Sequence, residues 1–155
     1  MSTLFNEQIA YWNGTQDTDS ATTFSSTDTY TDLIMNIDNA FGTDTTISYS
    51  NTDNEIKANS IGIYLVQSRL SVSGGANAEY TMQMTLDDVS IDYSEMTFTT
   101  KGSNLWEVQN LFLVELNLNP LTDSSIRTLK NEIKCTSGTN TLTLKNASFV
   151  LIRIQ

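Results

Sequence analysis

Three pairs of acidic side chains are the residues of this sequence best suited to chemistry. The pairs are Asp17/Asp19, Asp87/Asp88 and Asp92/Glu95. Two carboxyl groups that converge across a cleft, one of them with a raised pKa, can hydrolyse a glycosidic bond by acid–base catalysis. Each of these pairs lies in a polar, turn-forming stretch, which favours ordinary ionised acids instead. We therefore expect no enzymatic activity.

Metal binding is a better use of such carboxylates, because calcium takes oxygen ligands from clustered aspartates and backbone carbonyls. The sequence lacks a calcium loop with the required spacing of Asp, Asn and Gly. It also contains no histidine, the commonest general base and a frequent transition-metal ligand. A phosphate-binding glycine-rich loop and a nucleophile elbow are absent as well. We expect neither a metal nor a cofactor.

The single cysteine and three aromatic residues are the remaining candidates for reactivity or binding. Cys135 has no second cysteine and no histidine to pair with, so we expect a small buried side chain on a strand. Trp106, Tyr93 and Tyr49 are candidates for stacking on a sugar ring. Trp106 shares the alternation of the apolar residues that follow it, so core packing is the simpler interpretation for this residue.

The charge distribution excludes some partners. The net charge is −10 with a pI near 4.1, and no Lys or Arg precedes Lys57. An acidic chain whose few basic residues are scattered repels phosphates, so we expect no nucleic acid partner. The acidic first half is either a solubilising surface or a contact for a basic neighbour, such as the C-terminal third of a second copy. No apolar run reaches membrane length, so we expect no membrane partner.

Short alternating strands separated by turn residues must position all these side chains. At 155 residues the chain has the length of one domain. Strands are expected at 30–37, 45–50, 55–58, 61–73, 79–86, 89–91, 95–100, 105–119, 126–135 and 140–155. Gly74 and Gly75 are predicted to turn a hairpin between two of them, and Asp87 and Asp88 a tight turn. This pattern predicts an all-β antiparallel β-sandwich or jelly roll.

The last strand, 140–155, is apolar on nearly every residue from Phe149 to Ile154. A strand with two apolar faces must be covered on both, which predicts a central position in its sheet. Three strands carry apolar residues opposite their apparent core face, which suggests cover from another subunit. The predicted subunit interface consists of Ile61, Ile63, Leu65, Leu111, Leu113, Phe149 and Leu151. The alternative is a loop of the same chain folded over that face.

The N-terminal residues 1–29 are predicted to form an arm and linker, with the β-sandwich domain at 30–155. An apolar tip is followed by a stretch rich in Thr, Ser and Asp. The predicted attachment arm consists of Leu4, Phe5, Ile9, Tyr11 and Trp12. The alternative is that Trp12 packs back onto its own sandwich.

Two segments resemble a known family. Residues 141–154, TLTLKNASFVLIRI, resemble the closing element of tumour-necrosis-factor-like jelly rolls found in bacteriophage structural proteins, and residues 62–72, GIYLVQSRLSV, resemble a core strand of that group. The resemblance covers residues 60–155, and residues 1–59 match no family. It implies a homo-oligomer, with three subunits by analogy, and a virion localisation after synthesis in the host cytoplasm.

The implied function is that of a virion structural protein. It would be a capsid decoration (cement) protein or the head of a fibre or spike, attached to the capsid or to other virion proteins. The alternative is a carbohydrate-binding or adhesin module, with a host-surface glycan as its partner.

Overall fold

The computed structural model describes residues 9–102, 104–117, 126–137 and 141–154. Within them, one sheet, sheet A, contains β1 (Tyr11–Gln16), β2 (Ser20–Thr22), β4 (Asn39–Gly42), β7 (Gly62–Ser73), β11 (Trp106–Leu116) and β13 (Leu142–Arg153). The other, sheet B, contains β3 (Thr31–Asp32), β5 (Ile47–Ser50), β6 (Glu55–Asn59), β8 (Ala76–Leu86), β9 (Val89–Ser90), β10 (Met96–Lys101) and β12 (Ile126–Cys135). A single 3₁₀ turn, η1 (Asp92–Ser94), completes the described elements.

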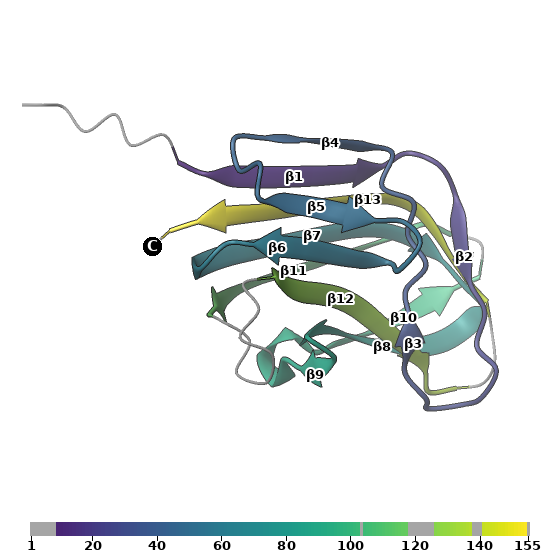
Figure 1. Cartoon of the computed structure of the whole chain (residues 1–155). Coiled ribbons are helices and arrows are strands. Elements are labelled where there is room, and N and C mark those ends of the chain that lie inside the picture. Colours follow the sequence, from purple (N-terminus) through teal and green to yellow (C-terminus); the bar gives the residue numbers. More distant parts are fainter. Residues whose placement is uncertain (1–8, 103, 118–125, 138–140, 155) are drawn as a thin grey trace, which may run out of the picture.

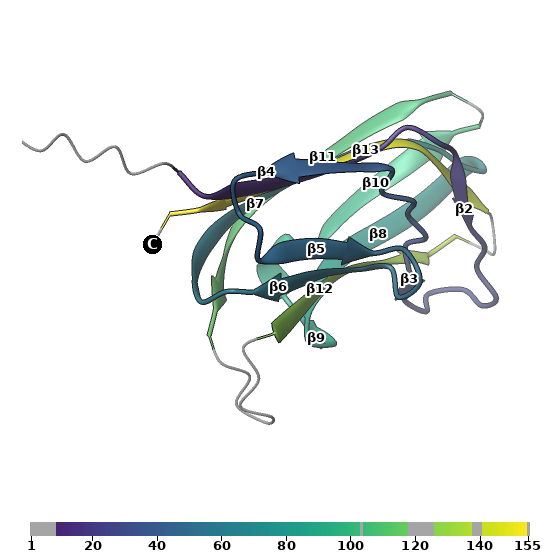
Figure 2. The same cartoon turned by 45° about the horizontal axis from the view of Figure 1, so that its top comes forward.

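The two sheets pack face to face as an antiparallel β-sandwich (Figure 1). Sheet A has the order β11-β7-β13-β1-β4, with β2 paired to one end of β13. Sheet B has the order β10-β8-β12-β6-β5, with β3 and β9 on β12 and β8. Figure 2 shows the two layers, with β4 and β1 above β5 and β6. The predicted all-β sandwich is confirmed.

The last strand, β13, is central, as predicted, because it pairs with β7 on one side and β1 on the other. Its face assignment, however, was wrong. Phe149 and Leu151 are fully buried in the core, and not on the outer face. The cause is a β-bulge at Lys145, which adds one residue between Leu144 and Asn146 and exchanges the two faces of the rest of the strand.

The predicted boundary between arm and domain is also wrong. β1 and β2 are integral strands of sheet A, and Trp12 is buried in the core. Trp12 thus packs onto its own sandwich, which was the alternative prediction. Gly14 makes room for it, because a Cβ atom on Gly14 would lie 2.4 Å from Trp12 Cη2. Of the predicted arm, Tyr11 is half-buried in β1 and Ile9 is exposed, while Leu4 and Phe5 lie outside the described residues.

The predicted hairpin at Gly74 and Gly75 is a connection between sheets. β7 belongs to sheet A and β8 to sheet B, so the two strands do not pair. A Cβ atom on Gly74 would lie 2.6 Å from the hydroxyl of the buried Tyr80, so glycine permits this close crossing. The predicted tight turn is confirmed: Asp87 and Asp88 both have positive φ, 50° and 63°, between the paired strands β8 and β9.

The 33–37 segment is buried like a strand but lacks a continuous ladder. Leu33, Met35 and Ile37 are in the core, which is the alternation that predicted a strand at 30–37. Only Thr31–Asp32 form a strand there. Side chains satisfy much of the remaining backbone: the N–H groups of residues 34, 35 and 37 donate to Thr22 Oγ1, Asn54 Oδ1 and Asn51 Oδ1 at 2.9, 3.3 and 2.9 Å.

Gln16 joins this segment to sheet A. Its side chain is fully buried. Nε2 donates to the Thr18 carbonyl at 2.7 Å, to Ser20 Oγ at 2.9 Å and to the Leu144 carbonyl at 3.4 Å. Oε1 accepts from the Asn36 N–H at 2.7 Å. One amide therefore links β1, the corner into β2, β13 and the 33–37 segment.

We predict that Gln16→Met lowers the free energy of unfolding by about 3 kcal/mol, because it leaves buried backbone groups without partners. Urea denaturation followed by circular dichroism measures the change. Gln109→Met is the matched control, since the Gln109 side chain is exposed and makes no hydrogen bond within the described residues. Equal stability of the Gln16 variant and the wild type would contradict the linking role.

We also predict that stability falls as the pH rises above about 10, the ordinary pKa of tyrosine. Burial raises the pKa of Tyr64 and Tyr80, so above this pH the unfolded chain loses phenolic protons that the folded chain retains. The unfolded state is thereby favoured. Tyr64→Phe should make the decline of unfolding free energy with pH less steep in urea titrations. Equal slopes for Tyr64→Phe and the wild type would contradict this assignment.

Candidate subunit interface and surface hollow

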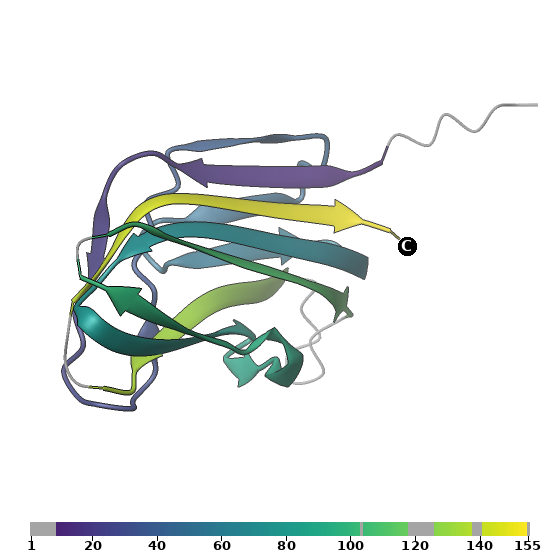
Figure 3. The ribbon, with the colours of Figure 1, turned by 180° about the vertical axis from the view of Figure 1, so that it is seen from behind.

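Figure 3 shows sheet A from its outer side, with β1, β13, β7 and β11 lying side by side. Residues paired across these strands form rows on this face. Strand register defines one row as Tyr11, Ile152, Leu65 and Leu113, on β1, β13, β7 and β11. The next row is Phe41, Asn13, Val150, Gln67 and Leu111, on β4, β1, β13, β7 and β11. Together with the neighbouring Ile63, the apolar members form what we call the apolar band: Tyr11, Phe41, Ile63, Leu65, Leu111, Leu113, Val150 and Ile152.

The apolar band is open to solvent in this single copy. Leu111, Leu113 and Phe41 are 57%, 48% and 55% exposed. A contiguous apolar surface across several strands is typical of a protein–protein contact. No described segment folds over these three side chains, so the alternative cover by a loop is not found there. The band ends where β1 begins and β13 ends, beside the exposed Ile9 and Ile154.

The structure brings together part of the predicted interface. Ile63, Leu65, Leu111 and Leu113 lie in the apolar band, and Ile61 is exposed just before β7. Phe149 and Leu151 lie in the core, and Val150 and Ile152 occupy the outer face in their place. Val150 and Ile152 belong to the apolar run noted in the sequence. The bulge that turns them to the outer face could not be recognised there.

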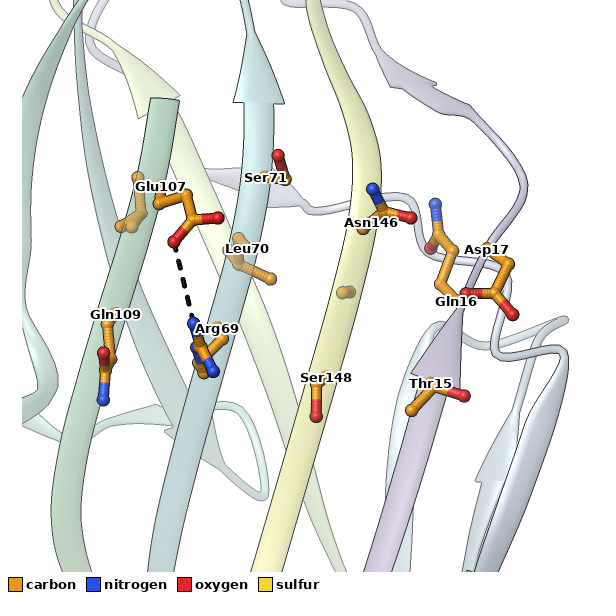
Figure 4. A pocket seen from close by; sticks show the side chains of 12 residues that line it. Thr15, Gln16, Asp17, Arg69, Leu70, Ser71, Glu107, Gln109, Asn146 and Ser148 are labelled. Atoms are coloured by element: carbon orange, nitrogen blue, oxygen red, sulfur yellow. Dashed lines mark ion pairs between the residues drawn. The ribbon is translucent and has the colours of Figure 1, made fainter. Parts of the chain in front are cut away.

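The other end of the same face is polar and hollowed. Two further rows lie there: Thr15, Ser148, Arg69 and Gln109, then Asn146, Ser71 and Glu107. They surround a hollow of about 390 Å³ (Figure 4). Arg69 Nη2 lies 3.6 Å from Glu107 Oε2, with both side chains largely exposed, so this ion pair contributes little to stability. We call this feature the polar hollow; sequence reasoning missed it.

The predicted carboxylate pairs do not form catalytic dyads. Asp87 accepts from Arg127 and from the Thr128 N–H, whereas its neighbour Asp88 accepts from Lys130 at 2.9 Å. Asp19 is paired with Lys145. These carboxylates thus serve separate cationic partners and do not converge on a shared cleft.

The third pair is also divided. Asp92 accepts from Ser90 Oγ at 3.2 Å, and Glu95 accepts from the Tyr30 hydroxyl at 3.0 Å. Burial and this hydrogen bond raise the pKa of Tyr30 to about 12. Within the described residues, no three acidic or cysteine side chains gather in a way that suits a metal ion. Cys135 is free and fully buried, as predicted.

Only one of the three predicted sugar-stacking residues presents an open ring. Tyr93 is 66% exposed and lies edge-on to Phe112, with ring centroids 6.0 Å apart. Trp106 is partly buried against the core, and its Nε1 is buried. The hydroxyl of Tyr49 is buried as well.

The outer face of sheet B is charged and internally paired. Lys57 lies 3.0 Å from Asp53, Lys130 lies 2.9 Å from Asp88, and Lys134 lies 2.8 Å from Asp28. The acidic first half and the basic last third meet within one copy at Lys134–Asp28, Lys145–Asp19 and Lys130–Glu55. Such a face is suited to water, in contrast with the apolar band of sheet A. The described residues include no helix with the length and hydropathy that a membrane span requires.

Comparisons with known proteins identify the fold. No family model and no curated protein matches the sequence. Among solved structures, murine APRIL at pH 8.0 matches 95% of this chain and 100% of its own, at 8% identity and a TM-score of 0.58. The globular domain of zebrafish complement 1qA protein matches 96% and 98%, at 9% identity and a TM-score of 0.55.

Eiger TNF from S. frugiperda matches 95% of this chain and 92% of its own, at 12% identity and a TM-score of 0.50. At such identities the likeness shows the fold alone, and the link to bacteriophage structural proteins stays a prediction. The chain has the jelly-roll fold of tumour-necrosis-factor-like and C1q-like domains.

Proposed function

We propose that this chain is a virion structural protein that assembles as a trimer through the outer face of sheet A. It serves as a capsid decoration protein or as the head of a fibre or spike, and attaches to the capsid or another virion protein through its N-terminal residues. The observation that carries the self-association is the apolar band. Eight apolar or aromatic side chains in register across five strands are costly to leave in water.

The dimensions of the band suit the centre of an interface. Strand spacing of about 4.8 Å gives it a width of roughly 19 Å across five strands, and a rise of about 3.4 Å per residue gives a height of roughly 14 Å. A stable contact buries about 800 Å² on each partner, so the band supplies an apolar centre and the polar residues around it a rim. In a ring of three, this face meets a different surface of the next copy.

The charged outer face of sheet B supports the same orientation. Lys57, Lys130 and Lys134 are already paired with carboxylates of the same chain, so these charges need no partner subunit to compensate them. We infer that sheet B faces solvent in the assembly and that sheet A faces the neighbouring copies.

The attachment segment is shorter than the sequence suggested. Because Tyr11 and Trp12 belong to β1, the proposal places the attachment contacts before them, with Leu4 and Phe5 as the apolar residues. Ile9 is exposed where the chain leaves β1. The proposal therefore assigns attachment to residues 1–8 and leaves the sandwich to the trimer.

We predict that Leu113→Glu dissociates the trimer, raising the dissociation constant about 30-fold or more, because it places a carboxylate in the apolar row. Sedimentation equilibrium measures the mass. Val89→Glu is the matched control: Val89 is an exposed apolar residue on sheet B, and its substitution should leave the mass unchanged. A monomeric wild-type protein would refute the assembly outright.

We predict that deleting residues 1–8 abolishes binding to the purified particle while the trimer stays folded. The deletion ends before β1, so Trp12 and the core remain intact. Cosedimentation with particles measures attachment, and circular dichroism with sedimentation measures the trimer. As a finer control, Leu4→Asp with Phe5→Asp should have the effect of the deletion. Undiminished binding by both variants would contradict an N-terminal attachment.

A further inference from the structure

We propose that the polar hollow on the outer face of sheet A binds a neutral saccharide. The hollow lies next to the apolar band on the same face. Gln109 in the hollow is two residues from Leu111 in the band, which corresponds to about 7 Å along β11. The proposal concerns a site within one copy and does not rest on the trimer.

Residues of four strands form the walls of the hollow (Figure 4). Gln109 and Glu107 come from β11, Arg69 and Ser71 from β7, and the other wall comes from β13 and β1. The volume of about 390 Å³ falls in the range of small-molecule sites, about 300–1,000 Å³. A site of this size accommodates one or two sugar rings.

Several polar side chains on these walls are free to bind. Within the described residues, the side chains of Thr15, Ser71, Gln109 and Asn146 make no hydrogen bond. The two amides each supply donors and an acceptor, and the two hydroxyls both donate and accept. Sugar hydroxyls likewise donate and accept, so each can be satisfied by such a set. The groups are therefore matched to a ligand rich in hydroxyls.

The charges of the hollow argue against an anion. Arg69 is the one cation among its lining residues, and Glu107 and Asp17 also line it. Arg69 is already paired with Glu107 at 3.6 Å. The surplus of one carboxylate repels phosphate or sulfate. A neutral ligand suffers no such repulsion, and the carboxylates can accept hydrogen bonds from its hydroxyls.

The polar rim also argues against an apolar ligand. An apolar molecule would strip water from the amides and hydroxyls without replacing their hydrogen bonds, which is costly. Leu70, Val108 and Ala147 also line the hollow, but these residues are buried members of the core cluster. The bulge at Lys145 turns Ala147 toward the core and brings Asn146 to the rim. The same extra residue thus shapes the site.

The test is isothermal titration of the full-length protein with the methyl glycosides of glucose, galactose, mannose and N-acetylglucosamine, and with inorganic phosphate. We expect saturable binding of at least one glycoside and none of phosphate. Gln109→Ala and Asn146→Ala should each weaken that binding about tenfold, by loss of hydrogen bonds to the ligand. Asn117→Ala is the matched control, since Asn117 is exposed outside the hollow, and it should leave affinity unchanged.

Three results would overturn the site: no response to any glycoside at millimolar concentration, binding of phosphate in their place, or glycoside binding that survives both hollow variants. Leu113→Glu separates this proposal from the assembly, because it should change the mass and leave glycoside affinity intact. If glycoside binding disappears together with the trimer, the site lies between copies and the proposal of a single-copy site fails.

Discussion

One extra residue in β13, Lys145, determines which side chains of the last strand meet the core. Before it, Leu142 and Leu144 face inward; after it, Ala147, Phe149 and Leu151 do. Without the bulge, strict alternation would turn Phe149 and Leu151 to the outside. β13 is the middle strand of sheet A. The side to which its residues point therefore determines which side chains of the neighbouring strands they contact in the core and on the outer face. The core and the outer face both depend on this choice.

The core-facing residues of β13 form rows with residues of the neighbouring strands. Leu151 lies in register between Trp12 and Val66, and Phe149 lies between Gly14 and Ser68. The first row stacks three large apolar side chains, and the second places a large one beside two small ones. Large and small residues therefore alternate, which is how a close-packed interior is filled. Glycine at 14 belongs to this arrangement, since its missing side chain is the space that the Trp12 indole occupies.

The extended segments of this fold could be predicted from the sequence, but their pairing and the facing of the last strand could not. Period-two alternation reports that a segment is extended and half-buried, so the strands of the second half and the burial of Cys135 were predictable. Alternation does not report the partner: the segments on either side of Gly74 read as a hairpin, yet they enter different sheets. A bulge changes the apolar–polar alternation by a single residue, which an almost wholly apolar strand does not reveal. The facing of Phe149 could therefore not be predicted.

The N-terminal strands were missed for a different reason. β1 reads YWNGTQ and contains a glycine and a glutamine in its core-facing positions, which weakens any apolar alternation. Both residues are explained only by tertiary neighbours: Gly14 by the indole above it, and Gln16 by four hydrogen bonds that replace a missing ladder. A buried glutamine with every group satisfied looks in sequence like a polar loop residue.

The strand register that builds the core also arranges the outer face of sheet A, where the side chains meet solvent. β1, β7, β11 and β13 each contribute residues to both features, and strand register aligns these residues into the apolar band and the polar hollow. A face that was apolar throughout would bind any hydrophobic surface, and one that was polar throughout would bind none strongly. Division along the strands lets the apolar half associate while the polar half keeps its hydrogen-bonding groups in water. Since the rows of the two halves share the same four strands, a slip of one strand by a single residue would disrupt both at once.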